Sequence, residues 1–237
     1  MKRFYGFSSF QLHLFAMLFM LIDHVGYCFF PYCYVLRYIG RLSFPIFCFL
    51  LVNGFFYTKN KCKYFLRLLL FTVLSEIPFD LAFSNVFIEL DTQNVLLTFL
   101  ISFLMLLFLE KAKKKYFMFY PLIIFIFTAI AFILKTDYKG FGVLIVLIFY
   151  LTHNLDKKYR FIIQFIGLFI INFILFKGFC VSFGCVLLYS QPFAIFSLFF
   201  IWGYNGNKGY SNGFIKFFNY IFYPIHLILL YLLRICI

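Results

Sequence analysis

Two short stretches near the N-terminus place charged and titratable side chains inside apolar runs. Asp23 and His24 lie near the end of the first run, and Arg37 and Arg41 lie near the start of the second. A charge inside a segment of lipid-spanning length costs several kcal/mol unless it is paired or has a function. We therefore expect any chemistry of this chain to centre on these four residues.

His24 is the candidate general base, because a neutral imidazole can accept a proton at physiological pH. A carboxylate beside it would fix the tautomer, and Asp23 precedes it in the sequence. Adjacent residues on a helix do not face each other, so Asp23 can instead pair with Arg37 or Arg41. The alternative to catalysis is a structural ion pair that joins the first two segments.

Arg37 and Arg41 are spaced i, i+4 and so share one face of a helix. Their planar guanidinium groups suit a carboxylate or a phosphate, so they could neutralise Asp23 or hold an anionic group. Gly40 permits close helix approach, and we expect Pro45 to kink the helix at this point.

Further candidates lie in the first, third and last apolar runs. His13 precedes His24 by 11 residues, which returns to nearly the same helix face about 16 Å away. Arg67 lies near the start of the third run, where an arginine snorkels or binds a headgroup. Tyr223 and His226 are polar side chains in the middle of the last run, which indicates either a function or a helix–helix contact.

Polar residues also gather where the third run ends. Glu76 and Asp80 could orient a base or bind an amine, or they could mark the membrane interface. Asn94 could donate to a developing oxyanion or cap a helix. Asp137 and Tyr138 are open to the same two interpretations.

The composition is that of a membrane protein. Of the 237 residues, 65% are hydrophobic and only 12% are charged, and the mean hydropathy is +1.00. A soluble domain is roughly 45–50% apolar and about 25% charged. The basic residues lie in connections between apolar runs, where they set membrane topology rather than bind nucleic acid. We therefore expect a lipid bilayer, and no nucleic acid, around the chain.

Apolar runs of about 20 residues predict an all-α, polytopic helical bundle with about nine transmembrane helices in a single domain, residues 1–237. The expected helices are 9–30, 34–56, 64–83, 94–110, 116–134, 140–153, 161–177, 182–202 and 214–235. The first is expected to be a retained helix rather than a cleaved signal peptide, because the run is long and lacks a small-residue cleavage site. The sixth is short and could be re-entrant or tilted.

The connections on the side of the N-terminus carry most of the 21 basic residues. The positive-inside rule therefore predicts that the N-terminus is cytoplasmic. The seven cysteines form no CxxC motif and no zinc-site spacing, so we expect no metal. Cys28 with Cys33, and Cys180 with Cys185, could form disulfides on an oxidising side, but packing roles are favoured.

The chain resembles a known family in four stretches. In order along the chain, they are MLIDH, RYIGRLSFPIFCFLLVNGFFYT, KYFLRLLLFTVLSEIPFD and FYPIHL. From about residue 11 to 232 the chain resembles the TraX family, the pilin N-acetylases of conjugation systems. That family looks related to the membrane acyltransferase type 3 superfamily, whose members carry acetyl groups from cytoplasmic acetyl-CoA to acceptors outside. The resemblance implies a multi-pass protein of a bacterial cell membrane.

Carried over position by position, the resemblance makes His24 the catalytic base with Asp23 beside it, and it aligns the GR-x-x-FP motif with Gly40 to Pro45. Arg37 and Arg41 would steady the thioester or the oxyanion. His13 stands where these enzymes generally have Lys or Arg, so His13 and Arg67 are the expected residues for binding acetyl-CoA. The expected substrate-binding residues are Glu76, Asp80, Asn94, Tyr223 and His226.

The implied function is acetyl transfer to the N-terminal amine of a pilin or pilin-like peptide on the outer side. Another secreted peptide, a glycan or a lipid would use the same site, and transfer could be direct or pass through an acetyl-histidine. Two alternatives remain open: a non-catalytic scaffold for pilus or secretion assembly, and a small transporter that relays protons through Asp23, His24, Glu76 and His226.

Overall fold

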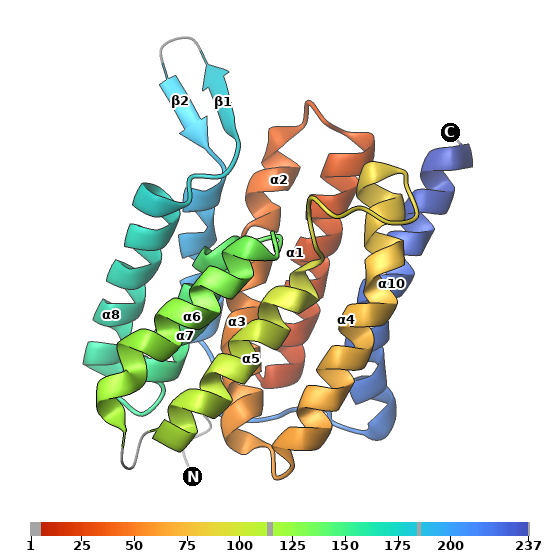
Figure 1. The fold of residues 1–237 in the computed structure, drawn as a ribbon. Coiled ribbons are helices and arrows are strands. Elements are labelled where there is room, and N and C mark those ends of the chain that lie inside the picture. The colour runs from red at the N-terminus through yellow and green to blue at the C-terminus, as the bar shows by residue number, and fades with distance from the viewer. Residues whose placement is uncertain (1–5, 113–115, 184–185, 237) are drawn as a thin grey trace.

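The computed structural model describes residues 6–112, 116–183 and 186–236 and is almost entirely helical (Figure 1). The long helices alternate in direction, with α2 and α3 following one another along a single path (Figure 1). The N-terminus lies at the lower end of Figure 1, and the strand pair and the C-terminus lie at the upper end. The helices are α1 Ser9–Phe29, α2 Tyr34–Gly40, α3 Ser43–Tyr57, α4 Lys61–Ser84, α5 Val95–Ala112, α6 Tyr120–Ile133, α7 Lys139–Thr152, α8 Lys157–Phe169, α9 Ser197–Trp202 and α10 Gly213–Cys236.

Within the described ranges, five stretches are long and apolar enough to cross a membrane by length and composition. They are Ser9–Phe29, Tyr34–Tyr57, Val95–Ala112, Lys157–Leu175 and Gly213–Cys236. Shorter apolar helices span Phe117–Ile133, Lys139–Thr152 and Gln191–Trp202. The prediction of an all-α membrane bundle is confirmed.

The expected helix over 34–56 is interrupted at Arg41 and Leu42, between α2 and α3, which are four and three residues before Pro45. Proline has no N–H to donate, and its ring clashes with the carbonyl of the residue four positions earlier, which here is Arg41. Pro45 therefore lies in the first turn of α3, where an unpaired N–H is normal, and the chain bends just before it. The expected kink is present as a break.

The expected helix over 182–202 is wrong in its first half. The chain instead forms an antiparallel pair of strands, β1 Cys180–Phe183 and β2 Val186–Tyr189, with Cys180 opposite Tyr189. A helix resumes only with a 3-10 turn at Gln191–Phe196 that leads into α9. Val, Phe, Leu and Tyr in this stretch favour extended structure as readily as helix, so apolar length alone could not decide between them.

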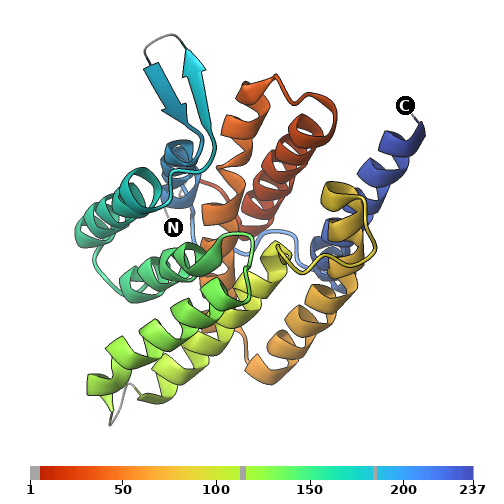
Figure 2. The same cartoon turned by 45° about the horizontal axis from the view of Figure 1, so that its top comes forward.

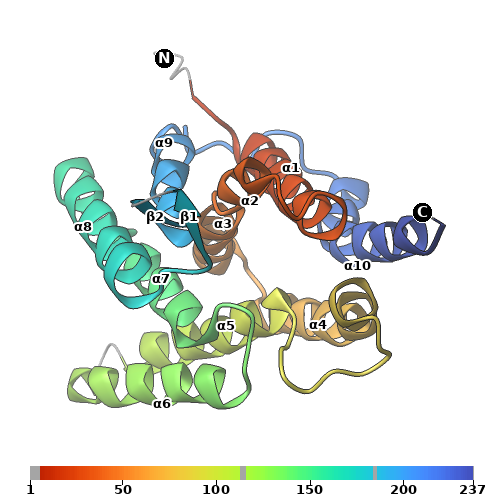
Figure 3. The same ribbon diagram turned by 90° about the horizontal axis from the view of Figure 1, so that it is seen from above.

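The main core surrounds α3, which is the most buried helix and lies in the middle of the bundle seen from above (Figure 3). Phe55, Phe103 and Phe149 from α3, α5 and α7 are among its largest fully buried side chains. A second, smaller cluster joins α4 to α10 through Phe79, Ala82, Tyr223 and Leu227. The α4–α10 pair lies at one side of the bundle (Figure 2) and has a small core of its own, while Leu68 of α4 packs in the main core.

The two ends of the bundle differ in charge. We call the lower end of Figure 1 the basic end; it includes the α3–α4 and α7–α8 connections and the 203–212 loop. Its described basic residues are Lys59, Lys61, Lys63, Lys111, Lys157, Lys158, Arg160, Lys208 and Lys216. The opposite end carries Lys135, Lys139, Lys177 and Arg234 together with Glu89 and Asp91. Cys28 and Cys33, at that opposite end, are free thiols, and Cys185 lies outside the described residues.

Candidate active site

The imidazole of His24 on α1 meets the imidazole of His226 on α10. His24 Nδ1 lies 2.8 Å from His226 Nε2, and the planes of the two rings are nearly parallel, with an interplanar angle of 5°. The other nitrogen of His226, Nδ1, lies 2.8 Å from the carbonyl oxygen of Phe222. This contact joins two residues that are 202 positions apart in the sequence.

These contacts determine where the protons lie when both rings are neutral. A carbonyl oxygen can only accept, so His226 Nδ1 carries a hydrogen and its Nε2 carries a lone pair. That lone pair requires His24 Nδ1 to donate. The lone pair of His24 is therefore on Nε2, which makes no hydrogen bond with a described residue and can accept a proton.

Asp23 does not orient His24. Its carboxylate accepts from Arg37 Nη1 at 2.8 Å and from Arg41 Nη2 at 2.6 and 2.7 Å, and the Asp23 residue is only 8% exposed. Arg37 also donates to the Asp23 carbonyl. The predicted neighbour of the base is thus an anchor for two arginines, and His226 takes the orienting position that the sequence had given to Asp23.

The arginine–carboxylate cluster carries a formal excess of one positive charge, because two guanidinium groups share one carboxylate. It lies close to His24 because α1 and α2 approach tightly at Gly40, where any Cβ would overlap the Asp23 side chain. Fixed guanidinium groups in a site withdrawn from water stabilise a negative charge that develops beside them. The cluster is suited to an anionic group or an oxyanion.

A cavity of about 730 Å³ runs along the inside of the bundle between the two packed cores. Its wall is formed by α1, α3, α5, α4 and α10, which follow one another around it (Figure 3), and by Arg37 and Arg41. One stripe of α1 lines it, with His13, Met17, Met20, His24 and Tyr27. The prediction that His13 and His24 share a face is confirmed.

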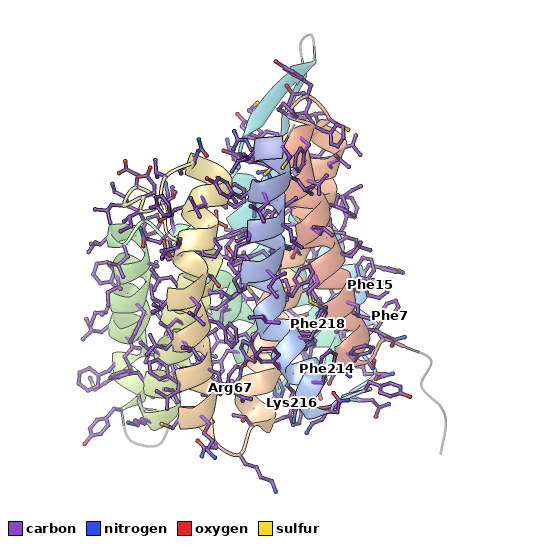
Figure 4. The ribbon with its side chains drawn as sticks, turned by 90° about the vertical axis from the view of Figure 1, so that its right-hand side faces the viewer. Phe7, Phe15, Arg67, Phe214, Lys216 and Phe218 are labelled. Carbon is purple, nitrogen blue, oxygen red and sulfur yellow. The ribbon has the colours of Figure 1, made fainter. Side chains whose placement is uncertain are left out.

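The cavity reaches both ends of the bundle. Lys59 and Lys208 line it at the basic end, and Thr92 and Asp137 line it at the opposite end; all four are exposed. Arg67 and Lys216 also line it and lie toward the lower ends of α4 and α10 (Figure 4). Positive charge is thus concentrated at one mouth.

The remaining predicted site residues divide into two groups. His13 and Arg67 line the basic half of the cavity; His13 Nδ1 contacts the Ser9 carbonyl, and the Arg67 guanidinium lies 5.7 Å from the Tyr220 ring. Tyr223 lines the cavity near His24, whereas His226 lies behind His24 and does not form part of the wall.

Glu76, Asp80 and Asn94 are outside the cavity wall. Asn94 donates to Glu76 and to the Thr72 carbonyl, and Asp80 accepts from the backbone N–H of Glu89. These contacts fasten the 85–94 connection to α4. The geometry gives the three residues a positioning role, and we assign them no contact with substrate.

Asp137 and Tyr138, for which the sequence left a functional and a structural interpretation open, both belong to the cavity wall. Both line the cavity, and the Tyr138 ring stacks on Phe44 with 3.5 Å between centroids. Asp137 is an acidic residue in a short connection, like many surface residues, so its sequence context could not decide between the two interpretations. Only the position of the α6–α7 connection brings it to the arginine cluster.

A family model described as "TraX protein" matches residues 8–234. The chain belongs to the TraX family. It is also 31% identical over 245 residues to the probable fimbrial assembly protein FimC, serogroup H1, of Dichelobacter nodosus, and the match covers 97% of each chain. No solved structure matches. Together with its apolar helices, this membership makes the chain a multi-pass membrane protein of bacteria.

Proposed function

We propose that this TraX family member transfers an acetyl group from acetyl-CoA, held at the basic end, to an acceptor amine that enters from the opposite end. The observation that carries the proposal is the cavity itself: it reaches both ends of the bundle and holds the lone pair of His24 between them. A site with this geometry can bring together two substrates that approach from opposite sides of a membrane.

The donor suits the basic half of the cavity by charge. Lys59, Lys208, Lys216 and Arg67 can hold the phosphate groups of coenzyme A. A volume of about 730 Å³ lies within the range of small-molecule sites, roughly 300–1,000 Å³. The thioester would then extend toward Arg37 and Arg41. His13 contributes a polar wall rather than the fixed charge that a lysine or arginine would supply.

The chemical step follows from the proton positions. His24 Nε2 removes a proton from the acceptor amine as its nitrogen attacks the thioester carbonyl. The carbonyl oxygen becomes an oxyanion beside the arginine cluster. The C–S bond then breaks, and the protonated His24 returns its proton to the coenzyme A thiolate. While His24 is protonated, its Nδ1–H remains bonded to the His226 lone pair.

The acceptor that we propose is the N-terminal amine of a pilin or pilin-like peptide. Support comes from the TraX membership and from the relative in Dichelobacter nodosus, whose name describes fimbrial assembly. A role in pilus or fimbrial assembly is the broader statement, and acetylation of the pilin is the specific one.

The test is the intact mass of pilins and other secreted peptides from cells with the wild-type chain and with His24→Ala. We expect the wild type to give a mass increase of 42 Da, the mass of an added acetyl group, and the variant to give none at equal protein level. The reason is that loss of a general base lowers the reaction rate by about 10²–10⁴-fold. His153→Ala is the matched control, since His153 lies at the end of α7 outside the cavity wall and stacks on Phe56. Acetylation that persists in His24→Ala contradicts the proposal. If His24→Ala lowers pilus number with no change in any product mass, the scaffold role replaces it.

A further inference from the structure

The cavity wall contains two carboxylates in the part of the chain that the structure describes, Asp23 and Asp137. Asp23 is fully used by Arg37 and Arg41. Asp137 accepts no hydrogen bond and forms no ion pair with any described residue, and it is exposed to the cavity. An unpaired carboxylate in a binding cavity attracts a cationic or hydrogen-donating ligand group.

The backbone of Asp137 is held firmly, although it lies in a connection. Its N–H donates to the Gln93 carbonyl at 3.0 Å, and the Gln93 N–H donates to the Lys135 carbonyl at 3.1 Å. Lys135 also forms an ion pair with Asp91. The next residue, Tyr138, is fixed by its stacking on Phe44. Asp137 is thus presented to the cavity by two connections that support each other.

We propose that the Asp137 carboxylate binds the amino group of the acceptor and makes the site selective for amines over hydroxyls. This inference rests on the proposed function in placing the acceptor at this end of the cavity. An ammonium or amine offers two or three N–H donors, one of which can stay on Asp137 while another faces the base. A hydroxyl has a single hydrogen, so it cannot serve both groups.

The surrounding charges favour this role. Withdrawal from bulk water raises the pKa of Asp137 to about 6, while Arg41 and Arg37 act in the opposite direction, so the carboxylate is mostly ionised at neutral pH. The same arginines disfavour a positive charge on the bound acceptor and so help it to lose a proton. The charged and titratable groups that act on Asp137 or respond to it are Arg41, Arg37, Asp23, Tyr138 and Tyr223.

The experiment measures equilibrium binding without acetyl-CoA, using the full-length chain in lipid nanodiscs. The probes are glycyl-leucyl-phenylalanine amide and its analogue with a hydroxyl in place of the amino group. We expect the wild type to bind the amine at least about tenfold more tightly, and Asp137→Asn to abolish this preference. Asp137→Glu is expected to retain it. Asp156→Asn is the matched control, because Asp156 lies at the start of α8 at the basic end, outside the cavity wall.

Titration provides a second measurement on the same samples. The wild-type preference for the amine is expected to fall as the pH drops through about 6, where Asp137 becomes protonated, and Asp137→Asn is expected to show no such change. A wild type without preference, or an Asp137→Asn variant that keeps it, overturns the inference. Because no donor is present, this result is independent of whether acetyl transfer itself is observed.

Discussion

His226 determines which nitrogen of His24 is free to accept a proton. Its own orientation is fixed by the Phe222 carbonyl, one turn earlier on α10. The backbone thus orients His226, and His226 orients His24. The ring of Phe222 also stacks on the His226 imidazole, with 4.8 Å between the ring centroids. In the proposed reaction His226 is therefore a positioning residue, which acts through the tautomer of His24.

We expect His226→Leu to lower acetyl transfer by about 10²-fold, because Leu cannot accept the His24 Nδ1 hydrogen and the tautomer is no longer fixed. His226→Gln is expected to retain much more activity, since its amide can accept from His24 and donate to the Phe222 carbonyl. The measurement is the initial rate of acetyl-peptide formation at matched protein levels. Equal losses in the two variants, with both folded, would show that the tautomer does not limit the rate.

At the scale of elements, the site depends on how closely α2 crosses α1. Gly40 faces Asp23, and Gly26 faces Leu36 and Arg37 one turn farther along α1. The break before Pro45 allows α2 to tilt independently of α3 and bring both arginines onto one carboxylate.

We expect Gly40→Ala to lower the melting temperature in detergent, because the added Cβ overlaps the Asp23 side chain and must separate α1 from α2. Overpacking of this kind costs about 1–3 kcal/mol in unfolding free energy. Gly213→Ala is the control: nothing lies within 4 Å of its Cβ position at the start of α10. Alanine there should leave stability unchanged or raise it slightly. An unchanged melting temperature in Gly40→Ala would contradict the tight crossing.

At the scale of the whole molecule, the uneven charge of the two ends predicts orientation in the membrane. The basic end is expected to face the cytoplasm by the positive-inside rule. That orientation would give cytoplasmic acetyl-CoA access to the lysine-lined mouth and leave Asp137 and Thr92 at the outer mouth.

Native cysteines can test this orientation. Cys62 is exposed in the first turn of α4 at the basic end, and Cys33 is exposed between α1 and α2 at the opposite end. In single-cysteine variants of intact cells, a membrane-impermeant maleimide is expected to label Cys33, and Cys62 only after permeabilisation. If the maleimide labelled Cys62 but not Cys33 in intact cells, the chain would have the opposite orientation, and the proposed direction of transfer would be contradicted.

The sequence by itself determined the class of protein and most helix positions, and it identified Asp23, His24, Arg37 and Arg41 as the candidate site. These conclusions rest on local quantities: the length of an apolar run, the spacing along a helix and the cost of a charge in lipid. The same local reasoning failed at 180–189, because an apolar stretch is compatible with strand as well as helix.

Only the tertiary structure decided which groups meet. It paired His24 with His226 rather than with Asp23, assigned Asp23 to both arginines, and brought Asp137 from a short connection into the cavity. It also placed Glu76, Asp80 and Asn94 outside that cavity. Each of these outcomes depends on how helices distant in the sequence pack against one another, and no local pattern of residue types contains that information.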